Sequence, residues 1–295
     1  MNLLIQNLEK TYPNGVRALD NLNLEIGPGM FGLLGPNGAG KSSLMRTIAT
    51  LQQPDSGTLT FAGLDILRQQ HAFRRILGYL PQEFGVYPKT SAVELLDYFA
   101  VLKGISSKKD RQARVQEVLE LTNLYEVRKQ YVSGYSGGMK QRFGIAQLLL
   151  NQPKLLIVDE PTAGLDPAER TRFLNVIRAV ATDNVVIFST HIVDDVKDLC
   201  HEMAVMNHGR VLAQMAPATA IGQLAGKVWT ATIDPTHLSG FSTRYPVLSS
   251  GYDEQHQLTV RVFAEEQPAP EFTHAAATLE DVYFYFLQDP APANN

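Results

Sequence analysis

The sequence is poor in cysteine and lacks long apolar stretches. Cys200 is the only cysteine in 295 residues, so no intramolecular disulfide can form, and a reducing cytosol is the expected compartment. No segment approaches the ~18 to 20 apolar residues that a membrane-spanning helix needs. The start of the chain, MNLLIQNLEK, does not resemble a signal peptide. We therefore expect a soluble protein, for which any role at a membrane depends on a partner.

Charge of either sign is also scarce. Charged residues make up 19% of the chain, and the formal net charge of -4 gives no indication of a nucleic-acid-binding surface. We therefore expect no nucleic-acid partner. Apolar residues account for 44%, which is typical of globular proteins rather than disordered or fibrous ones. The length allows one large domain, or one large and one small domain.

Up to about residue 222, short apolar runs alternate with segments of helical spacing. The runs at residues 155–158 and 185–188 are typical of strands that helices cover on both faces. Residues 91–130 have helical spacing, so we expect a helical subdomain over about residues 85–150, inserted between two parts of a parallel sheet. The fold class is therefore α/β. The pattern also predicts strands at residues 5–8, 22–26, 30–34 and 58–63 and a helix at residues 42–50.

The last part of the chain has a different pattern. Residues 228–233 and 258–263 alternate like strands of an antiparallel sheet, and residues 279–287 have helical spacing. We expect a large domain over residues 1–222, a small accessory domain over residues 223–288 and a disordered tail over residues 289–295.

Residues 35–42 read GPNGAGKS and match the phosphate-loop pattern G-x-x-x-x-G-K-[ST] between a predicted strand and a predicted helix. The glycines let backbone N–H groups turn toward phosphates, and the helix adds its positive end. Lys41 is expected to reach the terminal phosphates and Ser42 to ligate magnesium. An ordinary glycine-rich turn is the alternative, which the Lys-Ser pair disfavours. The expected nucleotide-binding residues here are Gly35, Pro36, Asn37, Gly38, Ala39, Gly40, Lys41, Ser42 and Ser43.

Two carboxylates, Asp159 and Glu160, directly follow the apolar run at residues 155–158. Ligands bind at the carboxyl edge of a parallel sheet, so Asp159 is expected to hold the magnesium ion. Glu160 is then placed to orient the attacking water and to accept its proton. The alternative is a solvated acidic turn, which a neighbouring phosphate loop makes less attractive.

Two further polar residues follow strand-like runs. His191 comes after the strand at residues 185–188, where it is expected to contact the γ-phosphate and fix the attacking water. Gln82 follows the run at residues 78–80 and is expected to ligate magnesium or position water. Either residue alone would more often be structural. The predicted catalytic residues are Glu160, His191, Gln82 and Lys41, and the predicted metal ligands are Ser42, Gln82 and Asp159.

A second anion-binding helix start is expected at Ser136, Gly137 and Gly138, where a Ser-Gly-Gly turn opens a helix. One nucleotide does not need two such sites on one chain. A head-to-tail homodimer, in which each Ser-Gly-Gly turn covers the other chain's ATP, explains the excess.

Together these motifs resemble the ATP-binding subunit of an ABC transporter, over roughly residues 2–220. The resemblance implies a P-loop NTPase cassette with a mostly parallel core sheet, an antiparallel N-terminal β subdomain and an inserted helical subdomain, followed by a small C-terminal α+β segment. It also implies ATP hydrolysis with ATP and Mg²⁺ as cofactors. Residues 35–42 resemble the Walker A loop, residues 155–159 the Walker B strand and residues 163–166 the D-loop.

The resemblance also assigns single residues. Glu160 is similar to the catalytic base, Gln82 to the Q-loop glutamine and His191 to the switch histidine. Residues 136–138 resemble the signature motif, which usually begins with leucine and has glutamine or a similar residue in fifth place, whereas Tyr135 and Met139 stand here. The remaining nucleotide contacts that the resemblance implies are Ser136, Gly137, Gly138, Asp166 of the D-loop, and Tyr12, whose ring would stack on adenine.

Among the branches of this family, a transporter subunit fits best. The long coiled coil of the DNA-repair class and the second cassette of the translation class are both missing. The region 78–100 and the ending TLEDVY at residues 278–283 resemble bacterial exporters that move drugs, polysaccharides, lipids or ions through a separately encoded membrane subunit. That permease is expected to dock in the groove beside Gln82 at the cytoplasmic face of the membrane. The second expected partner is another copy of this chain or a homologous ATPase subunit. A soluble regulatory or nucleic-acid-linked ATPase without a membrane partner is the alternative.

Overall fold

The computed structural model describes residues 1–82, 85, 89–162, 164–182 and 184–288. The tail at residues 289–295, which we expected to be disordered, lies outside the described residues. So do Ala163 of the expected D-loop and most of residues 83–88 of the exporter-like segment after Gln82.

A six-stranded sheet forms the centre of the molecule, with the order β10-β9-β3-β8-β7-β6. The pairs within β9-β3-β8-β7-β6 are parallel, and β10 runs antiparallel to β9 at the edge. All residues of β7 and β8 are buried, as expected for apolar runs that helices cover on both faces. The predictions of a mostly parallel sheet and of strands at residues 30–34, 155–158 and 185–188 are thus confirmed, whereas the sequence pattern did not reveal β9 or β10. The strands are β3 (Gly29–Leu34), β6 (Leu77–Leu80), β7 (Leu155–Asp159), β8 (Val185–Thr190), β9 (Glu202–Asn207) and β10 (Arg210–Met215).

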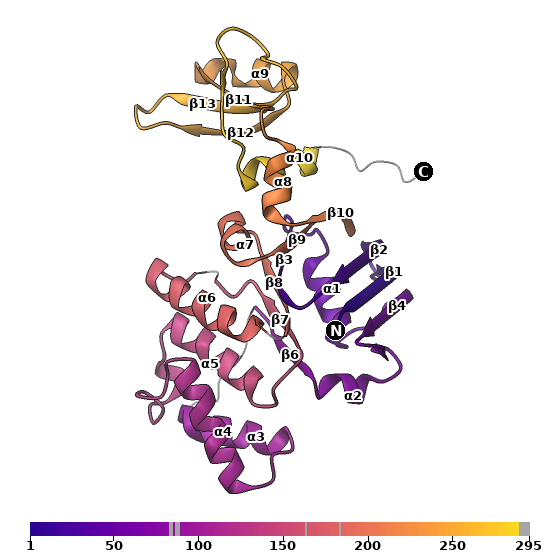
Figure 1. The fold of residues 1–295 in the computed structure, drawn as a ribbon, viewed down its shortest axis with the longest axis vertical. Helices are drawn as coiled ribbons and strands as arrows, with labels where there is room; N and C mark the ends of the chain where they lie inside the picture. The colour runs from indigo at the N-terminus through magenta and orange to yellow at the C-terminus, as the bar shows by residue number, and fades with distance from the viewer. Residues whose placement is uncertain (83–84, 86–88, 163, 183, 289–295) are drawn as a thin grey trace.

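A smaller antiparallel sheet with the order β2-β1-β4-β5 lies beside the central sheet (Figure 1). Alternate residues of β1, such as Leu3 and Ile5, are buried against a cluster that includes Leu44 and Met45 of α1. This alternation is the period of a sheet with one covered face, and it confirms the antiparallel β subdomain. The elements are β1 (Leu3–Thr11), β2 (Arg17–Ile26), α1 (Lys41–Ile48), β4 (Ser56–Phe61) and β5 (Leu64–Asp65).

Helices form the rest of the cassette. Ser91, Ser107 and Ser136 accept backbone N–H groups at the starts of α3, α4 and α5, which explains why these helices begin there. In Figure 1 these three helices form the lower end of the molecule, as the inserted helical pattern predicts. The helices are α2 (Gln70–Arg74), α3 (Ala92–Leu102), α4 (Lys108–Leu121), α5 (Gly137–Leu149), α6 (Pro167–Ala181) and α7 (Val193–Leu199), with a short 3-10 turn at η1 (Val132–Gly134).

The C-terminal part forms a third sheet with the order β12-β13-β11-β14, at the upper end of Figure 1. Its small core contains Ala231, Val260, Val262 and Phe272. Helix α10 contacts α7, α8 and β9, so it joins this part to the cassette. The sequence pattern predicted β11, β13 and α10 but did not reveal β12, β14 or α9. The elements are α8 (Pro217–Gln223), β11 (Val228–Ile233), η2 (Pro235–His237), α9 (Leu238–Arg244), β12 (Val247–Tyr252), β13 (Leu258–Phe263), β14 (Thr273–His274) and α10 (Leu279–Gln288).

Among the residues that the structure describes, no helix has the length and apolar character needed to cross a membrane.

Candidate active site

A glycine-rich loop at residues 35–40 connects β3 to α1. Gly40 has a φ of 101°, and a Cβ there would lie 2.3 Å from the carbonyl oxygen of Ala18, so only glycine fits. Within the described residues no side chain caps the start of α1, which leaves its first N–H groups available to an anion. The loop borders a cavity of about 510 Å³. The cavity is lined by Tyr12, Val16, Ala18, Pro36, Asn37, Gly38, Ala39, Gly40, Lys41, Ser42, Ser43, Gln82 and Glu160.

Lys41 lies folded over this loop. Its side chain is buried, and Nζ donates to the carbonyl oxygens of Gly35 at 2.6 Å and Pro36 at 3.1 Å. Burial lowers the pKa of Lys41, while the charges of Glu160 and Asp159 act in the opposite direction. The ammonium therefore has only neutral hydrogen-bond acceptors in the described structure, and an anionic phosphate would be a stronger one.

Asp159 ends β7 beside the start of α1. Burial raises its pKa, as does the nearby charge of Glu160, while hydrogen bonds from Ser189 and Ser42 and the charge of Lys41 oppose this rise. Ser42 and Asp159 thus lie close together although they come from different elements. A hydroxyl and a carboxylate are hard oxygen donors of the kind that Mg²⁺ prefers, so this pair fits the predicted metal.

Glu160 has a left-handed backbone conformation, with a φ of 44°. Its carboxylate oxygen Oε2 lies 3.3 Å from Nε2 of Gln82 and 3.4 Å from Nδ1 of His191. These three residues follow β6, β7 and β8, whose carboxyl ends meet at one edge of the sheet. The His191 side chain is 55% exposed, so it is accessible to a phosphate or to a second chain.

Tyr12 lies across the start of α1. Its hydroxyl is 3.0 Å from Oγ of Ser43 and 3.0 Å from Oε1 of Gln52. Gln52 in turn donates to the Ser43 carbonyl and to Oγ1 of Thr47, both at 2.8 Å. The ring is therefore held beside the cavity by its hydroxyl. Sequence reasoning missed Gln52, because nothing in the residues around it marks a contact with Tyr12.

The Ser-Gly-Gly turn lies elsewhere. Ser136 caps α5 by accepting from the N–H of Met139 at 3.2 Å, and Asp166 caps α6 by accepting from Glu169 at 2.8 Å. A Cβ on Gly138 would lie 2.2 Å from Oε2 of Glu169, so glycine permits the close packing of α5 on α6. None of Ser136, Gly137, Gly138 and Asp166 lines the phosphate-loop cavity in the described part of this chain.

Tyr135, which departs from the usual signature leucine, is a core residue. It is 4% exposed, its hydroxyl donates to the carbonyl of Val127 at 3.0 Å, and its ring packs edge-on against Phe143. Burial raises the pKa of Tyr135 to about 12. The tyrosine thus supplies apolar packing and one internal hydrogen bond.

Sequence reasoning also missed two buried polar residues near the site. Ser189 bonds to Asp159 and Glu160, and Asp195 on α7 accepts from Oγ1 of Thr162 and from Nε of Arg170, each at 2.8 Å. Ser189 could have been found from the sequence, because it is a serine at the polar end of an apolar strand. The contacts of Asp195 depend on packing between α6 and α7, which no local pattern reveals.

Comparisons with known proteins agree with this geometry. The sequence model of the family "ABC transporter" matches residues 19–163. The chain is 38% identical to the uncharacterized ABC transporter ATP-binding protein YxlF of Bacillus subtilis, over 71% of this chain and 69% of that protein. It is 33% identical to the Nod factor export ATP-binding protein I of Cupriavidus metallidurans, over 95% of each. It also resembles the dimeric structure of MJ0796, a bacterial ABC transporter cassette, with a TM-score of 0.66 and 25% identity over 72% of this chain and 98% of that one.

Proposed function

This chain is an ATP-hydrolysing member of the ABC transporter family, and we propose that it powers export through a separately encoded membrane protein. The observation that carries the proposal is the meeting of Gln82, Glu160 and His191 at the phosphate-loop cavity. Export rather than import is supported by the relative that matches 95% of both chains and is named as an export ATP-binding protein.

We propose that the phosphate loop and Lys41 bind the ATP phosphates, with Tyr12 beside the base. Ser42 and Asp159 would hold the magnesium ion, with Gln82 as a further oxygen ligand, and the ion would neutralise charge on the terminal phosphates. The ammonium of Lys41 leaves its carbonyl partners for the phosphate oxygens, because charge-assisted hydrogen bonds are roughly twice as strong as neutral ones.

Glu160 is then the group that accepts a proton from the attacking water. Gln82 and His191 contact the same carboxylate oxygen, so they fix its direction and flank the position of the water. Because His191 is half exposed, its ring remains free to contact the γ-phosphate as well.

The remaining nucleotide contacts come from a second copy of the chain or from a homologous subunit. Ser136, Gly137, Gly138 and Asp166 lie outside this chain's own cavity, while Ser136 opens α5 with N–H groups suited to an anion. A head-to-tail dimer places these groups over the partner's ATP. The dimeric structure of the related cassette supports this arrangement.

We further propose that residues 1–222 form the ATP-binding domain and residues 223–288 an accessory domain. The separate sheet and small core of the C-terminal part support this division. The location that follows from the proposed function is the cytoplasmic face of the membrane, through contact with the permease.

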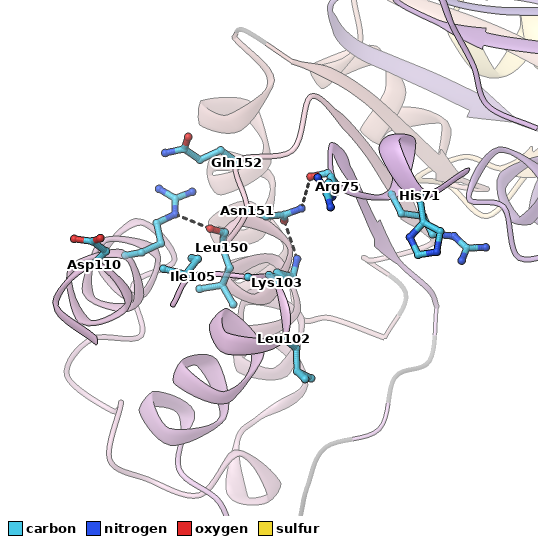
Figure 2. Close-up of a pocket in the computed structure, with 12 residues that line it drawn as sticks. His71, Arg75, Leu102, Lys103, Ile105, Asp110, Leu150, Asn151 and Gln152 are labelled. Carbon is cyan, nitrogen blue, oxygen red and sulfur yellow. Dashed lines mark hydrogen bonds between the residues drawn. The ribbon is translucent and has the colours of Figure 1, made fainter. Parts of the chain in front are cut away.

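The permease would dock in a groove of about 880 Å³ between α2 and the helical subdomain (Figure 2). Asn151 joins the two sides of this groove. Its side chain donates to the carbonyl of Arg75 at 2.7 Å and accepts from Nζ of Lys103 at 2.8 Å. The groove lies at the start of β6, whereas Gln82 follows its end, so the docking position differs from the one expected beside Gln82.

The lining of the groove indicates the chemistry of the docking segment. Arg74, Arg75 and Lys103 line it, and among the described residues none of them has a carboxylate partner. Leu102, which is 65% exposed, adds an apolar surface at the same place. An amphipathic helix of the permease that carries carboxylates would pair with the basic residues and cover the exposed apolar surface.

Glu160→Gln tests the catalytic proposal. The amide keeps size and polarity but accepts no proton, so turnover should fall by roughly 10² to 10⁴-fold while ATP still binds. The variant should accumulate as an ATP-bound dimer on size exclusion. Glu265→Gln, which changes an exposed carboxylate of the accessory part, should leave turnover unchanged. Near-normal turnover in pure Glu160→Gln protein would refute the role of Glu160.

Arg75→Glu and Lys103→Glu test the docking proposal, with the exposed Arg68→Glu as a control outside the groove. Both groove variants should lose the membrane protein that co-purifies with the parent chain, and the control should keep it. Burial lowers the pKa of Lys103 to about 8, so the parent interaction should be strongest below that pH and weaken as pH rises above it. If the membrane protein co-purifies equally with the parent and with both groove variants, the groove is not the docking site. If no membrane protein co-purifies with the parent, a soluble regulatory ATPase is favoured.

A further inference from the structure

Ser189 lies at the end of β8, next to the two carboxylate residues at the end of β7. Its side chain is 0% exposed, and its hydroxyl makes two hydrogen bonds. Oγ donates to Oδ1 of Asp159 at 2.7 Å and accepts from the N–H of Glu160 at 3.1 Å. We propose that Ser189 is a positioning residue that sets both carboxylates for ATP hydrolysis. The proposal rests on the roles proposed above for Asp159 and Glu160.

The hydrogen bond from Ser189 determines the orientation of the Asp159 carboxylate. The terminal torsion of an aspartate is broad, so a hydrogen-bond donor on one oxygen determines the direction of the other. Ser189 holds Oδ1 at 2.7 Å, and Ser42 at the start of α1 lies near the same carboxylate. The hydrogen bond from Ser189 thus fixes the plane of the group, in the way that an outer-shell partner orients a metal ligand.

The contact with Glu160 holds a strained backbone. A φ of 44° is uncommon for a residue other than glycine and persists where the surrounding structure holds it. The N–H of Glu160 points at Ser189, with 3.1 Å to its carbonyl oxygen and 3.1 Å to Oγ. This conformation directs the Glu160 side chain to Gln82 and His191.

A hydroxyl is the group best suited to make both contacts from this buried position. It donates one hydrogen bond while accepting another, which alanine and valine cannot do, and an amide is too large for a fully buried serine site. Threonine keeps the hydroxyl. The chemistry therefore predicts loss of function in Ser189→Ala and recovery in Ser189→Thr.

The test measures Mg²⁺-dependent binding of a non-hydrolysable ATP analogue, together with turnover. In Ser189→Ala, the Mg²⁺ concentration for half-maximal binding should rise roughly 10 to 100-fold, the typical effect of losing an outer-shell partner. Binding of the analogue in EDTA should stay within about twofold of the parent, because the phosphate loop is intact. Turnover should fall by a similar factor with little change in KM. Thr122→Val is the matched control, since it also removes a buried hydroxyl, far from the site in the helical subdomain.

The expected result is a changed Mg²⁺ dependence in Ser189→Ala, recovery in Ser189→Thr and no change in Thr122→Val. Parent-like Mg²⁺ dependence and turnover in Ser189→Ala would overturn the proposal, as would a folded Ser189→Thr that recovers neither. If alanine prevents folding, Ser189→Cys keeps the size with a weaker donor and should give an intermediate shift. Unchanged Mg²⁺ dependence in Asp159→Asn would instead refute the metal role of Asp159, which separates failure of the proposed function from failure of this inference.

Discussion

Replacing Asp281 with asparagine should loosen the C-terminal part of the molecule. Asp281 is 1% exposed and accepts from Nε and Nη2 of Arg261 at 2.8 and 2.7 Å, and from the N–H and hydroxyl of Thr278, both at 2.8 Å. These contacts tie α10 to β13. Asparagine keeps the shape but leaves the Arg261 guanidinium without its counter-charge.

The expected cost follows from the burial of the two partners. Removing one member of a fully buried ion pair costs ~3 to 5 kcal/mol. The Arg261 side chain is 27% exposed and regains some hydration, so we expect about 2 to 3 kcal/mol, less than the fully buried case. With a urea m-value of ~1 to 3 kcal/mol/M for a small domain, the unfolding midpoint should fall by roughly 0.7 to 3 M.

Trp229 makes this loss measurable. It is the only tryptophan, it lies on β11, and its indole N–H donates to the carbonyl of Ala264 at 3.1 Å, so its fluorescence reports the accessory sheet. Glu265→Gln is the control, because it breaks an exposed pair with Lys227 of the kind that contributes ~0 to 1 kcal/mol. A midpoint for Asp281→Asn that equals the control's would refute the reasoning.

The pH dependence of the same variant provides a second check. Burial acts to raise the pKa of Asp281, but hydrogen bonds from Arg261 and Thr278 outweigh it and hold the pKa below its ordinary value of 3.8. The stabilisation is therefore complete above the unfolded-state value and is lost as pH falls through the lower, folded-state value. The difference in stability between parent and Asp281→Asn should be constant near neutral pH and shrink below about pH 4.

Two further predictions concern the nucleotide. Tyr12→Ala should weaken ATP binding roughly tenfold or more, the ~1 to 3 kcal/mol of one aromatic stack, whereas Tyr12→Trp should bind nearly as well as the parent. Equal affinities for all three proteins in titration calorimetry would show that the ring does not face the base. Homodimers of Lys41→Ala and of Ser136→Glu should each be inactive, because one lacks the phosphate-loop cation and the other places a carboxylate near the γ-phosphate. Mixed dimers rebuild one complete site and should occlude about one ATP per dimer, and verified mixed dimers that occlude none would exclude a shared site.

Much of the cassette follows from local patterns in the sequence. The phosphate loop is a contiguous motif whose neighbours are a strand and a helix, so its structure depends on few distant residues. The apolar runs of β7 and β8 predict buried parallel strands, and the carboxyl ends of such strands share an edge. That rule alone places Gln82, Glu160 and His191 together, and the structure brings Gln82 and His191 within 3.4 Å of Glu160.

Other features of the chain have no local pattern. β12 contains Ser249, Ser250 and Gly251, a poor strand sequence that becomes a strand because it pairs with β13. The basic groove combines Arg75 with Lys103, which are far apart in a chain whose net charge is -4. The net charge of the whole chain does not reveal a local basic groove, because folding brings its residues together from distant parts of the sequence.

The fold class, the phosphate loop and the family can be derived from residue types alone, because each depends on short and regular spacing. Which polar groups touch depends instead on how the elements pack. Ser189 is separated by 30 residues from Asp159 yet donates to it at 2.7 Å, and Gln52 reaches Tyr12 across 40 residues. Such contacts form when separate strands and helices pack together, and their strength comes from distance and burial, which are properties of the folded chain.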